Sequence, residues 1–190
     1  MNKKGNVVGL LGRKRHGKDT IADYLGSKYG YEKYSFANPI KRGCMELFGF
    51  TEEQVFGDLK DEVDPLWGCT PRLMLQVLGT ELLQYDVQQY IPSFKDQIGR
   101  KVWVKCFNRY YTNNPGKNLS IADVRFIHES EEIKALGGII IKVVRPGMPD
   151  GDFHASEVEI DRMEYDHLII NDGSLESLYA KIDAIMNGVQ

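Results

Sequence analysis

The chain has 190 residues, of which 42% are hydrophobic and 27% are charged, and its formal net charge is -3 at pH 7. The length fits a single compact domain, and the composition excludes intrinsic disorder and a disulfide-dense scaffold. The small negative charge argues against broad binding to duplex nucleic acid, which needs many basic contacts to phosphates. We therefore expect a globular protein that has no nucleic acid polymer as a partner.

The cysteines and the apolar runs indicate a soluble protein of a reducing compartment. Cys44, Cys69 and Cys106 lie far apart and lack C-x-x-C spacing, so neither a disulfide framework nor a zinc site is expected. The apolar run around Ile139–Val144 is far too short to span a bilayer, and no secretory apolar region follows the charged N-terminus. These features predict reduced thiols, no membrane contact and a cytoplasmic location.

Strand and helix patterns alternate along the N-terminal part of the chain. The apolar run that starts at Asn6 and ends in Gly12 predicts a buried strand followed by a tight loop. Residues 19–29 carry an apolar helical face, and Gly30 supplies the stop. The patterns then predict a strand at residues 33–36, a helix at 38–48 and mixed polar connections from 51 to 68.

Two helices are expected in the middle of the chain. Thr70 followed by Pro71 is a strong helix start, because an N-cap residue precedes a proline at the first helical position. An apolar face is predicted to continue from there through Leu73, Met74, Val77, Leu78 and Leu82. A further helix is expected from about residue 100 to 111.

The C-terminal part repeats the alternation. We expect a strand at residues 119–122, a short helix at 129–136, a strand at 138–144 and a last strand at 168–171. The charged, proline-containing and glycine-containing stretch 146–165 is typical of a mobile excursion. Ser174 caps a closing helix whose apolar residues recur at three- and four-residue steps: Leu175, Leu178, Tyr179, Ile182, Ile185 and Met186.

This order of elements predicts an α/β fold. About five short strands separated by helices imply a parallel sheet with helices on both faces, since parallel neighbours need crossover connections. Ligands bind such sheets at the carboxyl ends of the strands. The functional residues are therefore expected where the predicted strands end.

The clearest motif runs from Gly12 to Thr20 and reads Gly-Arg-Lys-Arg-His-Gly-Lys-Asp-Thr. Its G-x-x-x-x-G-K spacing lets consecutive backbone amides surround the phosphates of a nucleotide while Lys18 reaches the outer ones. The motif opens a helix, so the helix N-terminus adds partial positive charge. Asp19 stands where Ser or Thr usually binds magnesium, so either Asp19 or water takes that place. Thr20 either binds a phosphate or stabilises the first helical turn.

Charged residues follow two other predicted strands. Asp123 and Arg125 come directly after the strand at 119–122, and Arg145 ends the strand at 138–144. An acid at this edge can hold magnesium, directly or through water, and an arginine can hold phosphate with two parallel hydrogen bonds. A surface ion pair is the simpler alternative for Asp123 and Arg125. The order of a phosphate loop after the first strand and an acid after a later one favours the functional interpretation.

Arg72 and Gln76 lie one helical turn apart on the helix that Thr70 begins, so they could hold a phosphate and a base together. A solvated helix face is nearly as good an explanation. His154 and His167 have no partner at metal-binding spacing and are interpreted as ordinary polar residues.

Six segments together are similar to one known family. They are the phosphate loop and the blocks Phe36-Ala-Asn-Pro-Ile-Lys41, Pro71-Arg-Leu-Met-Leu-Gln-Val-Leu-Gly-Thr80, Trp103-Val-Lys105, Asp123-Val-Arg125 and Asn171-Asp-Gly-Ser174. In this order they resemble the phage-type deoxynucleoside monophosphate kinases over nearly the whole chain. The chain is shorter between residues 50 and 70 than some members of that family.

The resemblance implies a three-layer P-loop kinase fold in a single domain over residues 1–190, with an acceptor-binding helical region at about 38–113 and a lid at about 146–165. It implies adenine near the loop 171–173 and ATP-binding residues at Lys14, His16, Gly17, Lys18, Asp19, Thr20 and Asn171. It places the acceptor nucleotide at Lys41, Arg72, Gly79, Thr80, Trp103, Asp123, Arg125 and Glu129, and we add Gln76 from its place beside Arg72. A phage-encoded chain would act in the host cytoplasm.

The implied reaction is transfer of the γ-phosphoryl group of ATP to the 5′-phosphate of a deoxynucleoside monophosphate. The catalytic groups would be Lys18, Arg72, Asp123, Arg125 and Arg145, with Mg2+ held at Asp19 and Asp123. No general base is required, because the acceptor phosphate is already ionised, and closure of the lid would exclude water.

Two alternatives stay open at this point. The first is another small-molecule P-loop kinase that acts on a coenzyme precursor or a phosphomevalonate-like acid. The second, disfavoured because a guanine-reading Asn/Thr-Lys-x-Asp motif is absent, is a nucleotide-dependent switch protein. Base selectivity, the choice between deoxyribose and ribose, and formation of a homodimer are not determined by the sequence.

Overall fold

The computed structural model describes residues 6–147 and 159–189. The chain divides into two compact units. The first, called here the sheet unit, comprises Met1–Ser35 and Tyr110–Gln190, and the second, called the helical unit, comprises Phe36–Arg109. Each unit is described by itself below.

The sheet unit is built on five parallel strands in the order β2-β3-β1-β4-β5. Their bounds are β1 Val7–Leu11, β2 Glu32–Tyr34, β3 Leu119–Ile121, β4 Ile139–Val144 and β5 His167–Ile170. The central strand β1 pairs with β3 on one side and with β4 on the other. The strand that follows β1 in the chain, β2, lies on the β3 side, whereas β4 and β5 lie on the other side, so the strand order switches direction at β1. The carboxyl end of β1 is therefore the position where an α/β sheet of this kind opens a crevice for a ligand.

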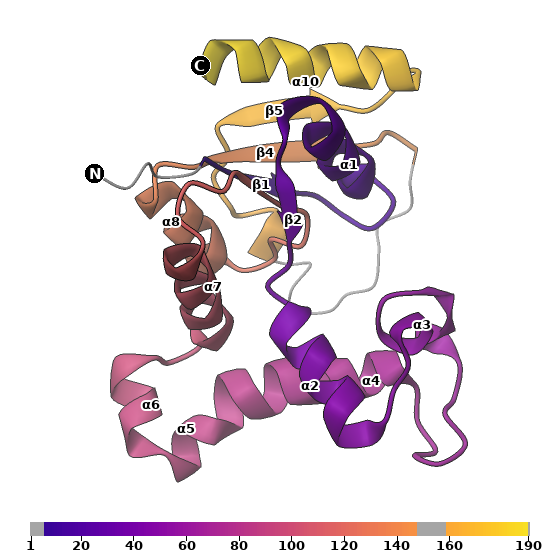
Figure 1. Ribbon diagram of the computed structural model, residues 1–190, viewed down its shortest axis with the longest axis vertical. Helices are drawn as coiled ribbons and strands as arrows, with labels where there is room; N and C mark the ends of the chain where they lie inside the picture. The colour runs from indigo at the N-terminus through magenta and orange to yellow at the C-terminus, as the bar shows by residue number, and fades with distance from the viewer. Residues whose placement is uncertain (1–5, 148–158, 190) are drawn as a thin grey trace. The chain divides into compact units, whose positions relative to one another are not determined.

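One face of the sheet is covered by α1 Lys18–Tyr29 and α10 Leu175–Val189 (Figure 1). The core on this face joins Val8 and Leu10 of β1 to buried residues of both helices, among them Ile21, Leu25, Leu178 and Ile182. Tyr24 of α1 stacks on Tyr179 of α10 with ring centroids 3.9 Å apart. Asp183 of α10 accepts hydrogen bonds from the hydroxyl groups of Tyr24 and Tyr29. Apolar burial and this polar cluster together hold α10 against α1.

The opposite face belongs to α8 Ile127–Ala135. Strand side chains alternate between faces, so Gly9 points away from Val8 and Leu10. A β-carbon at Gly9 would lie 2.6 Å from Ile140 and 2.9 Å from Ile133 of α8. The absence of a side chain at Gly9 thus lets α8 approach the middle of the sheet closely.

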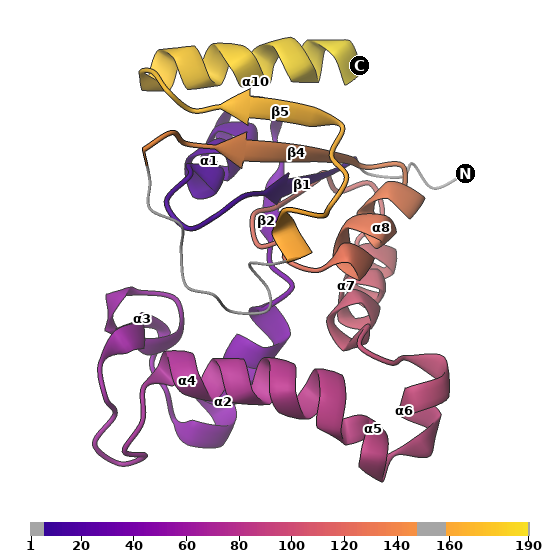
Figure 2. The same ribbon diagram turned by 180° about the vertical axis from the view of Figure 1, so that it is seen from behind.

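The helical unit contains a series of short helices: α2 Asn38–Phe48, α3 Glu52–Val55, α4 Pro71–Gln76, α5 Val87–Tyr90 and α6 Pro92–Gln97. A 3-10 helix covers Asp58–Asp61, and a π-helix, Val77–Asp86, joins α4 to α5 (Figure 2). The long helix α7 Val102–Asn113 begins in this unit and ends in the sheet unit. Thr70 caps α4 as expected, because its hydroxyl accepts a hydrogen bond from the backbone N–H of Leu73 at 3.1 Å.

The apolar face expected after Thr70 is in part wrong. Leu73 is 50% exposed, Val77 38% and Leu82 40%, whereas Gly79 and Gln84 are buried. For Val77 and Leu82 the reason is the π-helix, which has more residues per turn than an α-helix and so shifts the buried side away from the 3.6-residue positions. Leu73 precedes the π-helix and lies in α4. The stretch 51–68, expected to be polar connections, also contains α3 and the 3-10 helix.

The other predicted elements are confirmed with small shifts of their ends. The strand expected at 33–36 is Glu32–Tyr34, the strand expected at 168–171 is His167–Ile170, and the helix expected at 129–136 starts at Ile127. Ser174 caps α10 through a bond from the N–H of Ser177. Most of the predicted lid at 146–165 lies outside the described residues. None of the described helices is long and apolar enough to cross a membrane.

Candidate active site

The loop between β1 and α1 has the backbone geometry of an anion cradle. Three of its residues have positive φ: Gly12 at 152°, Arg15 at 66° and Gly17 at 102°. Successive N–H groups in such turns converge on one side, and the N-terminus of α1 directly follows. A β-carbon at Gly12 would lie 2.4 Å from the carbonyl oxygen of Val143, so only glycine lets the loop start so close to β4.

Side chains fasten this loop to neighbouring strand ends. His16 is buried, and its Nδ1 lies 3.1 Å from the carbonyl oxygen of Val143. Asn171, just after β5, donates a hydrogen bond from Nδ2 to the carbonyl oxygen of His16 at 3.0 Å. Arg13 pairs with Asp161 at 2.9 Å. The loop is therefore tied at the carboxyl ends of β4 and β5.

The expected ATP-binding residues occupy different positions on this loop. Lys14 and Asp19 are exposed, and Thr20 is half-buried in the first turn of α1. The ammonium group of Lys18 donates to the carbonyl oxygen of Arg13 at 2.8 Å, so its side chain folds back over the loop. Glycine, lysine and helix N-terminus are thus brought together as the motif predicts.

A second set of expected site residues follows β3. Asp123 accepts a hydrogen bond from the Ser35 hydroxyl, and Arg125 is exposed. Glu129 is buried within α8, and its Oε2 accepts hydrogen bonds from the backbone N–H groups of Arg125 at 2.8 Å and Phe126 at 3.1 Å. Glu129 therefore binds the backbone at Arg125 and Phe126 and is not exposed to an open pocket. This position differs from the expectation that Glu129 contacts the acceptor nucleotide.

Burial raises the pKa of Glu129 to about 8, and the nearby charge of Asp123 acts in the same direction. The two backbone N–H groups favour the ionised carboxylate and oppose this shift, but they are outweighed. Near neutral pH the Glu129 carboxyl is therefore largely protonated, which is unusual for a glutamate.

Arg145 follows β4 and is exposed, as expected for a residue at the carboxyl edge of the sheet. It lies next to the end of β4 that carries the Val143 contact with the phosphate loop. The sheet unit therefore gathers the phosphate loop, Asp123, Arg125 and Arg145 at the carboxyl ends of β1, β3 and β4.

The remaining expected residues lie in the helical unit. Arg72 forms a two-point ion pair with Asp61, in which Nη2 lies 2.9 Å from Oδ2. Gln76 is exposed one turn further along the same helix. The ammonium group of Lys41 lies 4.7 Å from the centre of the Phe56 ring.

The Leu-Gly-Thr segment meets α7 inside the helical unit. Trp103 is 8% exposed, and its indole N–H donates to the carbonyl oxygen of Gly79 at 2.9 Å. Gln84 donates to the same carbonyl at 3.3 Å. Thr80 is half-buried beside them. In this structure the Trp103 ring thus packs in the interior of the helical unit.

These observations agree with the comparison to known proteins. The sequence pattern of the deoxynucleotide monophosphate kinase family matches residues 6–64 and 51–182 of the chain. The chain belongs to the deoxynucleotide monophosphate kinase family.

Viral relatives span almost the whole chain. A protein of Acanthamoeba polyphaga mimivirus, provisionally named a deoxynucleotide monophosphate kinase, is 39% identical over 184 residues, which cover 93% of each chain. The deoxynucleotide monophosphate kinase of Escherichia phage RB69 is 30% identical over 241 residues, with 95% of this chain and 99% of the phage protein covered. Because 241 aligned positions exceed the 190 residues of this chain, the phage kinase carries inserted residues.

The fold also has a counterpart among solved structures. TT1252 from Thermus thermophilus has a TM-score of 0.52 with 14% identity, and the match covers 99% of this chain and 100% of that one. At this identity the likeness bears on the fold alone. Together with the strand order and the phosphate loop, it confirms the α/β P-loop kinase fold expected for the deoxynucleotide monophosphate kinase family.

The oxygen donors of the site fit a magnesium ion that is bound mainly through phosphates. Among the described residues, no three His, Cys, Asp or Glu side chains gather at metal-binding distance. Asp19 offers an exposed carboxylate at the start of α1, and Asp123 offers a half-buried carboxylate after β3 that accepts a hydrogen bond from Ser35. Mg2+ usually binds one or two carboxylates and completes its shell with water and substrate phosphates, which these two residues permit.

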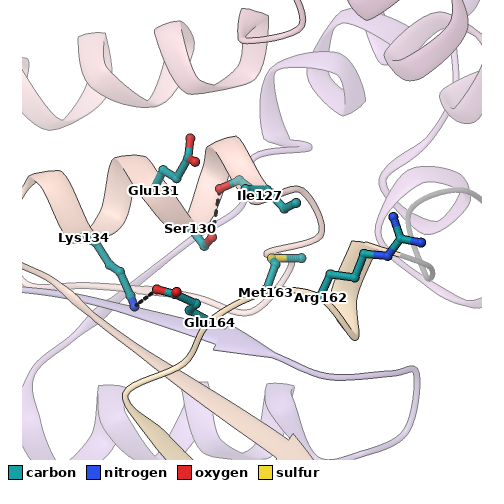
Figure 3. A pocket seen from close by; sticks show the side chains of 7 residues that line it. All are labelled: Ile127, Ser130, Glu131, Lys134, Arg162, Met163 and Glu164. Carbon is teal, nitrogen blue, oxygen red and sulfur yellow. Dashed lines mark hydrogen bonds and ion pairs between the residues drawn. The ribbon is translucent and has the colours of Figure 1, made fainter.

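A cavity of about 300 Å3 lies elsewhere in the sheet unit. As Figure 3 shows, it is lined by α8 and the segment that precedes β5, with Lys134 directed towards Glu164. None of the residues expected in a deoxynucleotide monophosphate kinase site lines it. The cavity is therefore separate from the phosphate loop.

Sequence reasoning missed several partners of the site residues. Ser35 and Asp61 each bind a residue that the sequence singled out, namely Asp123 and Arg72, and Asp161 binds Arg13 of the phosphate loop. These pairs are 88, 11 and 148 positions apart along the chain. No spacing rule connects residues at such separations, so no signal in a single sequence could have found them.

Proposed function

We propose that this member of the family transfers the γ-phosphoryl group of ATP to the 5′-phosphate of a deoxynucleoside monophosphate, producing the diphosphate and ADP. The observation that carries the proposal is the phosphate loop at the switch point of the sheet, in a chain of the deoxynucleotide monophosphate kinase family. The names of the phage and mimivirus relatives support the acceptor class.

The sheet unit supplies the groups for the donor. The amides of residues 12–18, the helix N-terminus and the Lys18 ammonium group would neutralise the phosphates of ATP. Lys18 would exchange its present bond to the Arg13 carbonyl for a bond to phosphate oxygens. Mg2+, held through Asp19 and Asp123, would neutralise charge that develops on the transferred group.

The helical unit supplies groups that suit a nucleoside monophosphate. Arg72 can bind a phosphate with two parallel hydrogen bonds, as it now binds Asp61, and Lys41 adds a second cation. Gln76 and Thr80 can bind polar atoms of the base or sugar. We assign the helical region of about 38–113 to acceptor binding on this basis, with the stretch 146–165 as lid.

The chemistry requires positioning and charge neutralisation more than proton transfer. An acceptor phosphate is already ionised near neutral pH, so no side chain has to act as general base. Arg125 and Arg145, both exposed after strands of the sheet, are the arginines that would stabilise the charge of the transition state. Asp123 would position Mg2+ or the acceptor.

The test is ADP formation from ATP and Mg2+ with dAMP, dGMP, dCMP and dTMP, each beside its ribonucleotide and a control without acceptor. Turnover that depends on a deoxynucleotide is the expected result and also reveals base and sugar selectivity. Turnover indifferent to every acceptor would indicate an ATPase or a switch protein. Complete absence of turnover would direct attention to coenzyme-precursor substrates.

A further inference from the structure

We propose that His16 and Asn171 are positioning residues that fix the peptide unit between His16 and Gly17, and so hold the phosphate-binding loop ready for ATP. This inference rests on the proposed use of the loop. It differs from the role of nucleotide contact that the family resemblance implies for both residues.

The His16 side chain is one half of the arrangement. His16 is 7% exposed, and its Nδ1 lies 3.1 Å from the Val143 carbonyl oxygen at the end of β4. A carbonyl oxygen can only accept, so Nδ1 carries the hydrogen and donates it. The buried ring thereby anchors the loop to the edge of the sheet.

Asn171 is the other half. Its Nδ2 donates to the carbonyl oxygen of His16 at 3.0 Å, and its own backbone N–H donates to the carbonyl oxygen of Val144 at 2.7 Å. His16 is thus bound through its side chain to one strand end and through its carbonyl to the residue that follows the next strand. The four residues His16, Val143, Val144 and Asn171 form a closed circuit.

This circuit determines where the next N–H group points. A trans peptide is planar, so its C=O and N–H groups point in opposite directions. Because the His16 carbonyl is bound to Asn171, the Gly17 N–H is turned away from Asn171. The left-handed φ of 102° at Gly17 then leads into α1.

The positive φ is one reason why residue 17 is glycine, and the nearby Asn171 side chain is a second reason. A β-carbon there would lie 2.6 Å from Nδ2 of Asn171. A side chain at this position would therefore displace the Asn171 amide and break its bond to the loop. Gly17 thus leaves the space that Asn171 needs to bind the His16 carbonyl.

A loop that is already ordered loses less conformational entropy when it binds a phosphate chain. Loss of either hydrogen bond should let the peptide rotate and weaken ATP binding, while the groups that act on the acceptor stay in place. One hydrogen bond of this kind corresponds to an effect of about 3- to 10-fold.

The experiment compares Asn171→Ala and His16→Ala with the wild-type chain. Tryptic cleavage after Lys14 and Arg15 in the ligand-free protein, followed by mass spectrometry, reports loosening of the loop without any need for activity. Steady-state kinetics then separate the KM for ATP from kcat. His16→Asn retains a side-chain N–H near the place of Nδ1 and serves as the rescue variant.

Ser27→Ala is the matched control. It also removes a side-chain bond to a backbone carbonyl, 3.1 Å long, but near the far end of α1. It should leave loop cleavage and kinetics unchanged.

The proposal predicts loop cleavage faster by about 3- to 10-fold in both alanine variants, a KM for ATP raised by a similar factor, and kcat within about 2-fold of wild type. His16→Asn should recover most of the loss. Unchanged cleavage and KM in both alanine variants would overturn the proposal. A raised KM without faster cleavage would overturn it too, because it would make these side chains direct nucleotide contacts. A wild-type chain without kinase activity would refute the proposed function, while loop cleavage would still report on the positioning.

Discussion

Glu129 makes folding stability depend on pH in a direction opposite to that of most carboxylates. Its carboxyl is buried, and its pKa rises from 4.5 to about 8 in the folded chain. Between these values the folded chain keeps a proton that the unfolded chain has lost, so the free energy of unfolding falls as pH rises. Below about pH 4.5 the carboxyl is protonated in both states, and this destabilisation is absent.

The size of the effect follows from the two pKa values. One pKa unit corresponds to about 1.4 kcal/mol, so the contribution of Glu129 should fall by roughly 3 kcal/mol between pH 5 and pH 8. Glu129→Gln keeps a carbonyl acceptor for the Arg125 and Phe126 N–H groups but cannot ionise. The variant should therefore gain about 3 kcal/mol relative to wild type over this pH interval, whatever its stability at pH 5.

Urea unfolding followed by circular dichroism at pH 5, 6, 7 and 8 measures this difference. Glu131→Gln is the control, because it makes the same chemical change at an exposed position of α8. Its stability should change with pH in parallel to wild type. If the curves for Glu129→Gln and wild type were also parallel, the carboxyl would ionise normally in the folded chain and the reasoning from burial would be wrong.

Three further substitutions test the site. Lys18→Ala should lower kcat by about 100-fold or more with an unchanged circular dichroism spectrum, because it removes a cation that would bind the phosphates of ATP; unchanged turnover would exclude Lys18 from the mechanism. Arg72→Ala should lower kcat/KM for the acceptor by about 10- to 100-fold in steady-state assays with ATP affinity nearly unchanged, and a selective loss of ATP binding would place Arg72 on the donor side. Gly12→Ala should weaken ATP binding by about 10-fold or more in titration calorimetry, because its β-carbon would meet the Val143 carbonyl at 2.4 Å; normal affinity would show that the loop adapts.

The sheet unit was largely predictable because its signals are local. Three signals follow one another within about 25 residues: an apolar run that ends in Gly12, the phosphate loop and the amphipathic α1. Each signal supports the same strand–loop–helix prediction. The last helix was equally clear, since Ser174 caps it and its apolar residues keep the 3.6-residue period.

The helical unit was harder to predict. Its longest helical run changes from α-helix to π-helix at Val77, and no sequence rule for the 3.6-residue period anticipates that change. Within the π-helix the buried residues are Gly79 and the polar Gln84, neither of which belongs to the predicted apolar face. The Gln84 amide binds the Gly79 carbonyl, which also accepts the Trp103 indole N–H.

The candidate site was predictable as a set of residue types and less so as a set of contacts. Spacing and strand ends singled out Lys18, Asp123 and Arg125, but the burial of Glu129 depends on how α8 packs against the sheet. The tie between Asn171 and His16 joins residues 155 positions apart. Contacts of this kind exist only once the sheet has placed β4 beside β1 and β5 beside β4.

The most direct test of the central claim follows the phosphoryl group itself. The chain is incubated with Mg2+, ATP labelled at the γ-phosphate and each deoxynucleoside monophosphate, and the products are separated by chromatography. The account predicts that the label appears in a deoxynucleoside diphosphate, in step with ADP formation, and that Lys18→Ala abolishes the transfer. Label found in inorganic phosphate at the same rate with and without acceptor would contradict it.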